Sequence, residues 1–182
     1  EVLFTVDEEI GLLGAVGLDC SVLKGRRFIN LDSEAAGSLW LSCAGGLSGI
    51  SHIPVQRVEG EGEKVQVKVC GLMGGHSGAE IDKNRANANK LMGLFLYGLK
   101  KKAEYALISL TGGQKDNAIT RECTAEFLTD SVAEVKAYAK ELQEQLREEY
   151  TGSDENITFE ITEKGTATAE VLHPTSQEKI VF

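Results

Sequence analysis

The sequence is poor in proline, aromatic residues and histidine, and its apolar stretches are short. Of 182 residues, two are proline, three are histidine and one is tryptophan, and aromatic residues make up 6%. No stretch reaches the ~18 apolar residues that a membrane-spanning helix needs, so we expect no membrane partner. Hydrophobic residues still make up 42% of the chain, which is enough for packed cores in one large domain or two small ones.

Basic residues are also in the minority. The chain has 19 lysines and arginines against 28 aspartates and glutamates, a net charge of −9. This charge opposes contact with phosphate backbones and anionic membranes, so we expect no nucleic-acid partner. Small molecules and other proteins are the expected partners.

The cysteines show no pairing pattern. Cys20, Cys43, Cys70 and Cys123 are widely spaced and form no C-x-x-C pair. We therefore expect reduced thiols and a cytoplasmic location.

The first third of the chain suggests part of a parallel sheet. Residues 2–6 and 28–31 have strand-like sequences, and an apolar helix is expected between them at 10–16. A further strand is expected at 39–43. The β-α-β order favours parallel strands. The chain begins without methionine, in a sequence typical of the middle of a strand, so we expect an internal fragment of a longer protein. The polar, irregular sequence of residues 49–63 predicts a domain boundary.

The rest of the chain alternates between strand and helix patterns. A capping box, Ser131 with Glu134, is expected to start the second helix. The order predicts a ferredoxin-like β-α-β-β-α-β sandwich. Its expected strands are 65–69, 105–111, 118–128 and 157–161, and its expected helices are 79–102 and 131–150.

Carboxylates follow two of the early strands. Asp7, Glu8 and Glu9 follow the first, and Asp32 follows the second. Strand ends are where open α/β sheets bind ligands, and neighbouring carboxylates can divide metal binding from proton transfer. The alternative is a solvated acidic turn that leads into a helix.

Further candidate functional residues lie in or near two glycine-rich loops. His76 lies in Gly-Leu-Met-Gly-Gly-His-Ser-Gly, residues 71–78, where glycines on both sides allow close approach of a ligand. Asn117 ends a second loop that ordinary turn chemistry would also explain. Arg85 is either an anion site or a helix-surface charge, and we slightly favour the surface charge.

Six segments, taken together, resemble the M20 metallopeptidases, and most of all their aminoacyl-histidine dipeptidase (Xaa-His dipeptidase) branch. Thr120 departs from the family pattern, which has proline there, and we expect an effect on loop rigidity alone. The resemblance is strong to about residue 128. The segments are 5–11, 29–34, 43–46, 74–78, 85–90 and 112–122.

The resemblance implies roles for six residues. Glu8 would be the general base, and His76 would steady the oxyanion. Two divalent metal ions would be bound, zinc by expectation with cobalt or manganese as alternatives, and dipeptides would be the substrate. The metal ligands would be Glu9 and Asp32, and the substrate-binding residues Asn117 and Arg85.

The resemblance also implies a domain plan. Residues 1–57 would be part of a parallel-sheet catalytic domain, 58–170 a lid that forms a homodimer, and 171–182 the start of the next segment. The family pattern needs further metal ligands, which His52 and His173 do not match. We therefore expect the full-length protein to hydrolyse Xaa-His dipeptides and this chain alone to be inactive. The alternatives are a non-catalytic dimerisation or binding module, and an M20 amidohydrolase acting on acylated amino acids.

Overall fold

The computed structural model describes residues 2–8, 11–29, 36–42, 47 and 49–181. The chain separates into two compact units, Glu1–Leu47 and Ser48–Phe182. The expected boundary after residue 57 falls at the beginning of the first strand, inside the second unit.

The first unit contains little regular structure. It has a four-residue helix, α1 (Leu13–Val16), and a 3₁₀ turn at Cys20–Val22. None of its described residues lies in a strand. The strands expected at 2–6, 28–31 and 39–43 are therefore absent from the described parts of those ranges. Their apolar side chains are open to solvent, as in Phe4, which is 89% exposed. A strand is stable only when neighbours pair with it and cover one face, and apolar sequence alone supplies neither.

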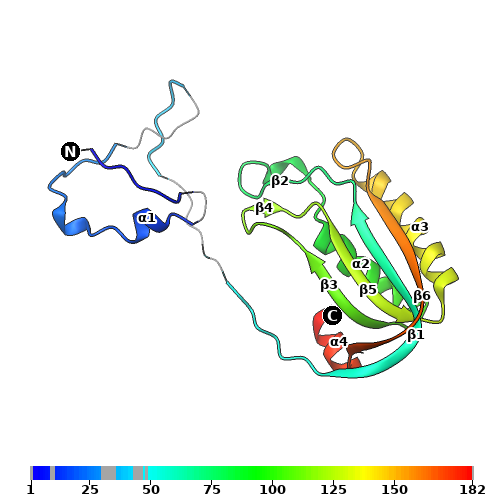
Figure 1. Cartoon of the computed structure of the whole chain (residues 1–182). Coiled ribbons are helices and arrows are strands. Elements are labelled where there is room, and N and C mark those ends of the chain that lie inside the picture. The colour runs from blue at the N-terminus through cyan, green and yellow to red at the C-terminus, as the bar shows by residue number, and fades with distance from the viewer. Residues whose placement is uncertain (1, 9–10, 30–35, 43–46, 48, 182) are drawn as a thin grey trace. The chain divides into compact units, whose positions relative to one another are not determined.

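The second unit confirms the predicted ferredoxin-like sandwich. Its antiparallel sheet has the order β3-β5-β1-β6, and two helices lie side by side on one face of it (Figure 1). The strands are β1 (Arg57–Cys70), β3 (Ala106–Gly112), β5 (Cys123–Thr129) and β6 (Thr158–Leu172), and the helices are α2 (Ala88–Leu99) and α3 (Val132–Glu149).

The core lies between this sheet and its helices. Val65, Val67 and Val69 of β1 are all 0% exposed, because alternate residues of a strand face the same side. Phe95 of α2 is also fully buried, and its ring centroid lies 5.3 Å from that of Phe159. Aromatic pairs at this separation add to the hydrophobic stabilisation of a core.

Helix α2 begins later than predicted, at Ala88 instead of residue 79. Asn84 adopts a left-handed backbone conformation, with φ of 50°, which stops a helix from running through it. Asn87 then caps α2, since its side-chain oxygen accepts the N–H groups of Asn89 and Lys90 at 3.0 and 3.3 Å. The predicted capping box of α3 is wrong in one respect: Ser131 precedes the helix without a side-chain cap bond.

The strand predicted at 118–128 is divided in two. Its first residues form β4 (Ala118–Ile119), which pairs with β2 (Gly75–His76) in a separate two-stranded ladder. After a link of three residues, 120–122, the chain continues as β5. The small ladder therefore follows the ends of β1 and β3 (Figure 1).

The last helix, α4 (Pro174–Val181), lies in the stretch expected to begin a further segment, and it packs on the second unit. The Gln177 side chain accepts the N–H of Leu107 at 2.7 Å and donates to the carbonyl of Tyr105 at 3.0 Å. These bonds tie α4 to the start of β3. Among the described residues, no helix has the length and apolar character of a transmembrane span.

Buried thiols in the second unit are chemically protected. Cys70 and Cys123 are free and buried, whereas Cys20 is free and exposed. Burial raises the pKa of Cys123 to about 11, because the thiolate is poorly solvated. These two thiols are therefore packing residues.

Two neighbouring positions on α2 test this account of the core. Replacing Phe95 with alanine should lower the free energy of unfolding by about 3–5 kcal/mol, since it leaves a cavity beneath the sheet. Leu94 is 46% exposed, and the matched change Leu94→Ala should cost about 1 kcal/mol or less. Urea unfolding followed by circular dichroism measures both, and equal losses would contradict the assigned core.

Candidate functional site

The acidic segment of the first unit is described at Asp7 and Glu8. The carbonyl oxygen of Glu8 accepts the N–H groups of Gly11 and Leu12 at 3.2 and 3.1 Å, and the Glu8 side chain is exposed. Glu8 therefore bonds to the residues just before α1. Glu9 and Asp32, the expected metal ligands, lie outside the described residues.

The described residues do not form a metal centre by themselves. Within those ranges, no group of three or more His, Cys, Asp or Glu side chains could hold an ion. Glu8 belongs to the first unit and His76 to the second. The expected metal ions therefore remain an inference from the resemblance.

In the second unit, the structure brings the backbones of His76 and Asn117 together. His76 pairs with Ala118 in the β2–β4 ladder, and the N–H of Ser77 donates to the carbonyl of Asn117 at 2.9 Å. Both His76 and Asn117 have exposed side chains. Two residues that the sequence singled out separately are thus held side by side.

The His76 ring is held by its own loop. Its Nδ1 accepts the N–H groups of Gly78 and Ala79 at 3.0 and 3.1 Å. A nitrogen that accepts hydrogen bonds has no proton, so the neutral ring carries its proton on Nε2. Within the described part of the chain, Nε2 has no hydrogen-bond partner. The ring can therefore offer an N–H donor to a bound ligand.

Glu80 forms hydrogen bonds and ion pairs with several residues of this loop. Its Oε2 accepts the N–H of His76 at 3.1 Å, and its Oε1 lies 3.0 Å from the Lys83 ammonium and 3.5 Å from the Arg85 guanidinium. The hydrogen bond from Lys83, with that from the His76 backbone next in weight, lowers the pKa of Glu80 below its ordinary value of 4.5. Glu80 therefore stays ionised at neutral pH and fixes the residues on both sides of the turn.

Arg85 is neither on a helix nor on the surface, so the favoured interpretation of a helix-surface charge is wrong. It precedes α2, and its side chain is 14% exposed. Besides Glu80, its Nη1 lies 2.7 Å from the Met73 sulfur, and its Nε is buried without a hydrogen-bond partner. These contacts put Arg85 inside the loop that carries His76.

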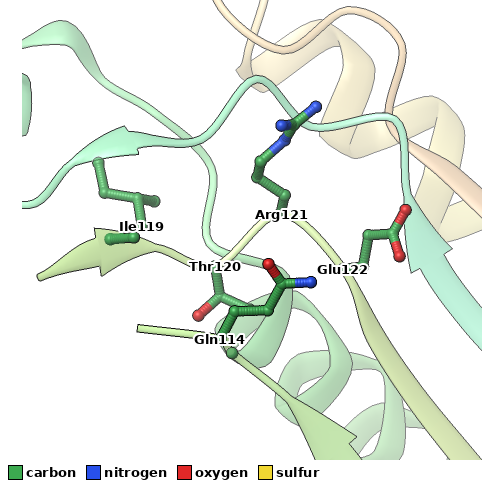
Figure 2. Close-up of a pocket in the computed structure, with 7 residues that line it drawn as sticks. Gln114, Ile119, Thr120, Arg121 and Glu122 are labelled. Atoms are coloured by element: carbon green, nitrogen blue, oxygen red, sulfur yellow. The ribbon is translucent and has the colours of Figure 1, made fainter. Parts of the chain in front are cut away.

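A pocket of about 280 Å³ lies beside the small ladder, and its lining comes from the loop before β4, from β4 itself and from the link between β4 and β5. Gln114 and Thr120 both line this pocket, and Figure 2 shows the Arg121 side chain pointing away from both of them. The Arg121 Nε donates to the carbonyl of Leu72 at 3.4 Å. The pocket is lined by Gly113, Gln114, Ala118, Ile119, Thr120, Arg121 and Glu122.

Thr120 connects this pocket to α2. It is 9% exposed, and its carbonyl accepts the N–H of Ala88, the first residue of α2, at 2.9 Å. The Asn89 amide also approaches its hydroxyl at 3.5 Å. At the position where the family pattern has proline, the side chain therefore contributes to a contact between the pocket and the helix.

Two residues of this region had no role in the sequence interpretation. Glu80 lay within the predicted helix. Asp154 lies in the polar stretch Thr151–Asn156, which reads as an ordinary turn, yet it is 2% exposed and its carboxylate accepts two backbone N–H groups. A buried aspartate in a turn has no local sequence signal, because its partners are distant in the chain.

Comparison with known proteins assigns the second unit. Residues 67–154 match the family model described as the peptidase dimerisation domain of the M20 family. This stretch is thus similar to M20 peptidase dimerisation domains. The chain is 38% identical over 163 residues to the cytosol non-specific dipeptidase of Escherichia coli (strain K12), covering 87% of this chain and 34% of that protein.

A solved structure is also similar. The aminoacylhistidine dipeptidase of Vibrio alginolyticus matches with a TM-score of 0.70 and 28% identity, over 97% of this chain and 37% of that one. The chain thus spans about a third of the length of the relatives it matches. Both relatives are named as dipeptidases, which agrees with the family that the motifs indicated.

The Glu80 carboxylate offers a test of the loop's electrostatics. We expect its titration midpoint, followed by NMR of the side-chain carboxyl carbon, to lie below 4.5 and to move back towards that value in Lys83→Met. Because the folded pKa is depressed, the stability that Glu80 contributes is present above its unfolded pKa and is lost as pH falls through the folded value. Lys90→Met, on the exposed side of α2, should leave the midpoint unchanged. A midpoint at or above 4.5 in the unsubstituted chain would contradict the described contacts.

Proposed function

We propose that the full-length protein to which this chain belongs is a dipeptidase that hydrolyses Xaa-His dipeptides and acts as a cytoplasmic homodimer. The match to the M20 dimerisation domain and the dipeptidase names of the two relatives support this proposal. The observation that carries it is the His76 ring, held at Nδ1 by two backbone N–H groups, with no partner for Nε2 among the residues that the structure describes.

His76 has the chemistry of an oxyanion donor. Peptide hydrolysis places negative charge on the carbonyl oxygen as water adds to the scissile carbon. A fixed N–H donor aimed at that charge stabilises the transition state more than the substrate, which is what accelerates the step. Asn117 lies beside His76 and can hold the dipeptide through its amide group. Arg85 would act on the substrate only after it leaves Glu80 and Met73.

The remaining roles come from the first unit. Glu8 would take a proton from the attacking water and give it to the leaving amine, the work of a general base followed by a general acid. Glu9 and Asp32 would each bind one of two divalent metal ions, with zinc proposed first. When bound, such ions lower the pKa of water and polarise a carbonyl.

The activity test uses the full-length protein. We expect turnover of β-alanyl-histidine and other Xaa-His dipeptides, with kcat reduced about 10²- to 10³-fold in His76→Phe and KM changed little, since the lost bond acts in the transition state. His52→Phe, another exposed histidine without an assigned role, should behave like the unsubstituted protein.

The substrate panel separates the alternatives. It should include dipeptides without histidine and N-acylated amino acids. Hydrolysis confined to acylated amino acids would favour the amidohydrolase alternative. A folded dimer with no turnover of any of them would favour a binding module and contradict the proposal.

Metal dependence is a separate test. We expect a chelator to abolish dipeptide turnover and added Zn²⁺ to restore it, because the attacking water would lose its activation. Turnover, together with metal content measured by mass spectrometry, should fall in Glu9→Gln and Asp32→Asn. Full activity in the metal-free protein would rule this mechanism out.

A further inference from the structure

A buried carboxylate joins two distant points of the chain next to His76. Asp154 lies in the turn between α3 and β6 and is 2% exposed. Its Oδ1 accepts the N–H of Met73 at 2.7 Å, and its Oδ2 accepts the N–H of Ala86 at 2.8 Å. Each oxygen therefore holds one backbone amide.

These two amides mark the ends of one segment. Met73 and Ala86 flank residues 74–85, which we call the His76 loop, and which contain β2, Glu80 and Arg85. A single side chain thus closes the base of the loop. Holding both ends together restricts the conformations open to the loop, at an entropic cost that grows only slowly with its length.

The same turn contacts the chain at two further points. The Ser153 hydroxyl donates to the carbonyl of Asn84 at 3.0 Å. On the other side, Gly71 has φ of +81°, and a Cβ there would lie 2.1 Å from the carbonyl oxygen of Asn156. Only glycine fits so close an approach, so the turn also packs against the chain that leaves β1.

The turn itself is fixed to the helix and the sheet. The N–H of Asp154 donates to the carbonyl of Tyr150 at the end of α3, at 3.0 Å, and its carbonyl accepts the N–H of Ile157 just before β6, at 3.2 Å. The position of the carboxylate is therefore set by the body of the domain. The His76 loop takes its position from that carboxylate.

The burial of Asp154 makes these bonds energetically important. A buried carboxylate is costly unless hydrogen bonds replace its water, and bonds from backbone N–H groups to a charged oxygen are strong. None of the ion pairs among the described residues includes Asp154. The two loop amides therefore supply the compensation that an ion pair would otherwise give.

We propose that Asp154 is a positioning residue, which holds the His76 loop closed at its base so that His76 presents Nε2 to the substrate. The part that concerns substrate rests on the proposed dipeptidase function, whereas the part that concerns the loop does not. Neither the family match nor the motifs assign this role to Asp154.

The variant Asp154→Asn replaces one of the two carboxylate oxygens with an NH₂ group and hardly changes the shape of the side chain. An amide has one accepting oxygen and one donating NH₂ group, so it can satisfy only one of the two N–H groups. The other backbone N–H group would face the NH₂ group, which is also a donor, and would lose its hydrogen bond. Glu155→Gln is the matched control, because Glu155 accepts the N–H of Gly152 at 2.8 Å within the same turn.

NMR of the 182-residue chain tests the loop directly. We expect the amide hydrogen of Met73 or Ala86 to exchange at least about tenfold faster in Asp154→Asn, and the two ring ¹⁵N shifts of His76 to move from the Nε2–H pattern towards a tautomer average. Glu155→Gln should leave both unchanged. Faster amide exchange with unaltered His76 ring shifts would overturn the positioning role.

A second variant covers a failure to fold. Asp154→Glu keeps both accepting oxygens and the charge but moves them by one methylene group. If Asp154→Asn does not fold, the same two readouts are taken on Asp154→Glu, with the same expected changes. Unchanged His76 ring shifts in that folded variant would equally overturn the proposal.

Kinetics of the full-length protein test the consequence for substrate. We expect kcat for β-alanyl-histidine to fall about ten- to a hundredfold in Asp154→Asn with KM within about twofold, because a displaced donor weakens transition-state binding. An unchanged kcat would overturn the link to catalysis. An inactive unsubstituted protein would instead refute the dipeptidase proposal, and the NMR result would still decide whether Asp154 holds the loop.

Discussion

The central position of β1 determines the rest of the second unit. β1 pairs with β5 on one side and β6 on the other, and its three alternating valines, Val65, Val67 and Val69, all face the helices. A slip of one residue in either ladder would turn these valines to solvent, so the register is strongly specified. The register places Cys70, the last residue of β1, opposite Thr158 at the start of β6. The chain that leaves β1 therefore enters the His76 loop beside the turn that precedes β6.

The fold of the second unit was accessible from the sequence where the patterns are long. The period of two around Val67 and the helical spacing of residues 131–150 identify the elements, and their order identifies the sandwich. The patterns failed at the start of α2, where the left-handed Asn84 and the Asn87 cap delay the beginning of the helix to Ala88. In the first unit, apolar runs such as residues 2–6 predicted strands, but their described residues have exposed side chains and no ladder.

The candidate site was accessible only in part. The glycines around His76 and the loop before Asn117 marked both residues, and the β2–β4 ladder does bring their backbones together. The contacts that hold the base of the loop were not accessible, because they join residues far apart in the chain. The bond from Ala86 to Asp154 spans 68 positions, and the bond from Met73 spans 81. No local pattern records which polar residue of a turn will be buried.

The glycines beside His76 serve close packing more than mobility. Gly75 has φ of +145°, and a Cβ there would lie 2.1 Å from the Glu80 carboxylate. Its missing side chain is what lets Glu80 reach the N–H of His76. The ring is then held at Nδ1 by two further backbone N–H groups, and Asp154 holds the loop at its base. A histidine anchored in this way presents its Nε2–H in a constant direction. That order, present before any ligand binds, is what an electrostatic catalyst requires, since a donor already in place needs no reorganisation as charge develops.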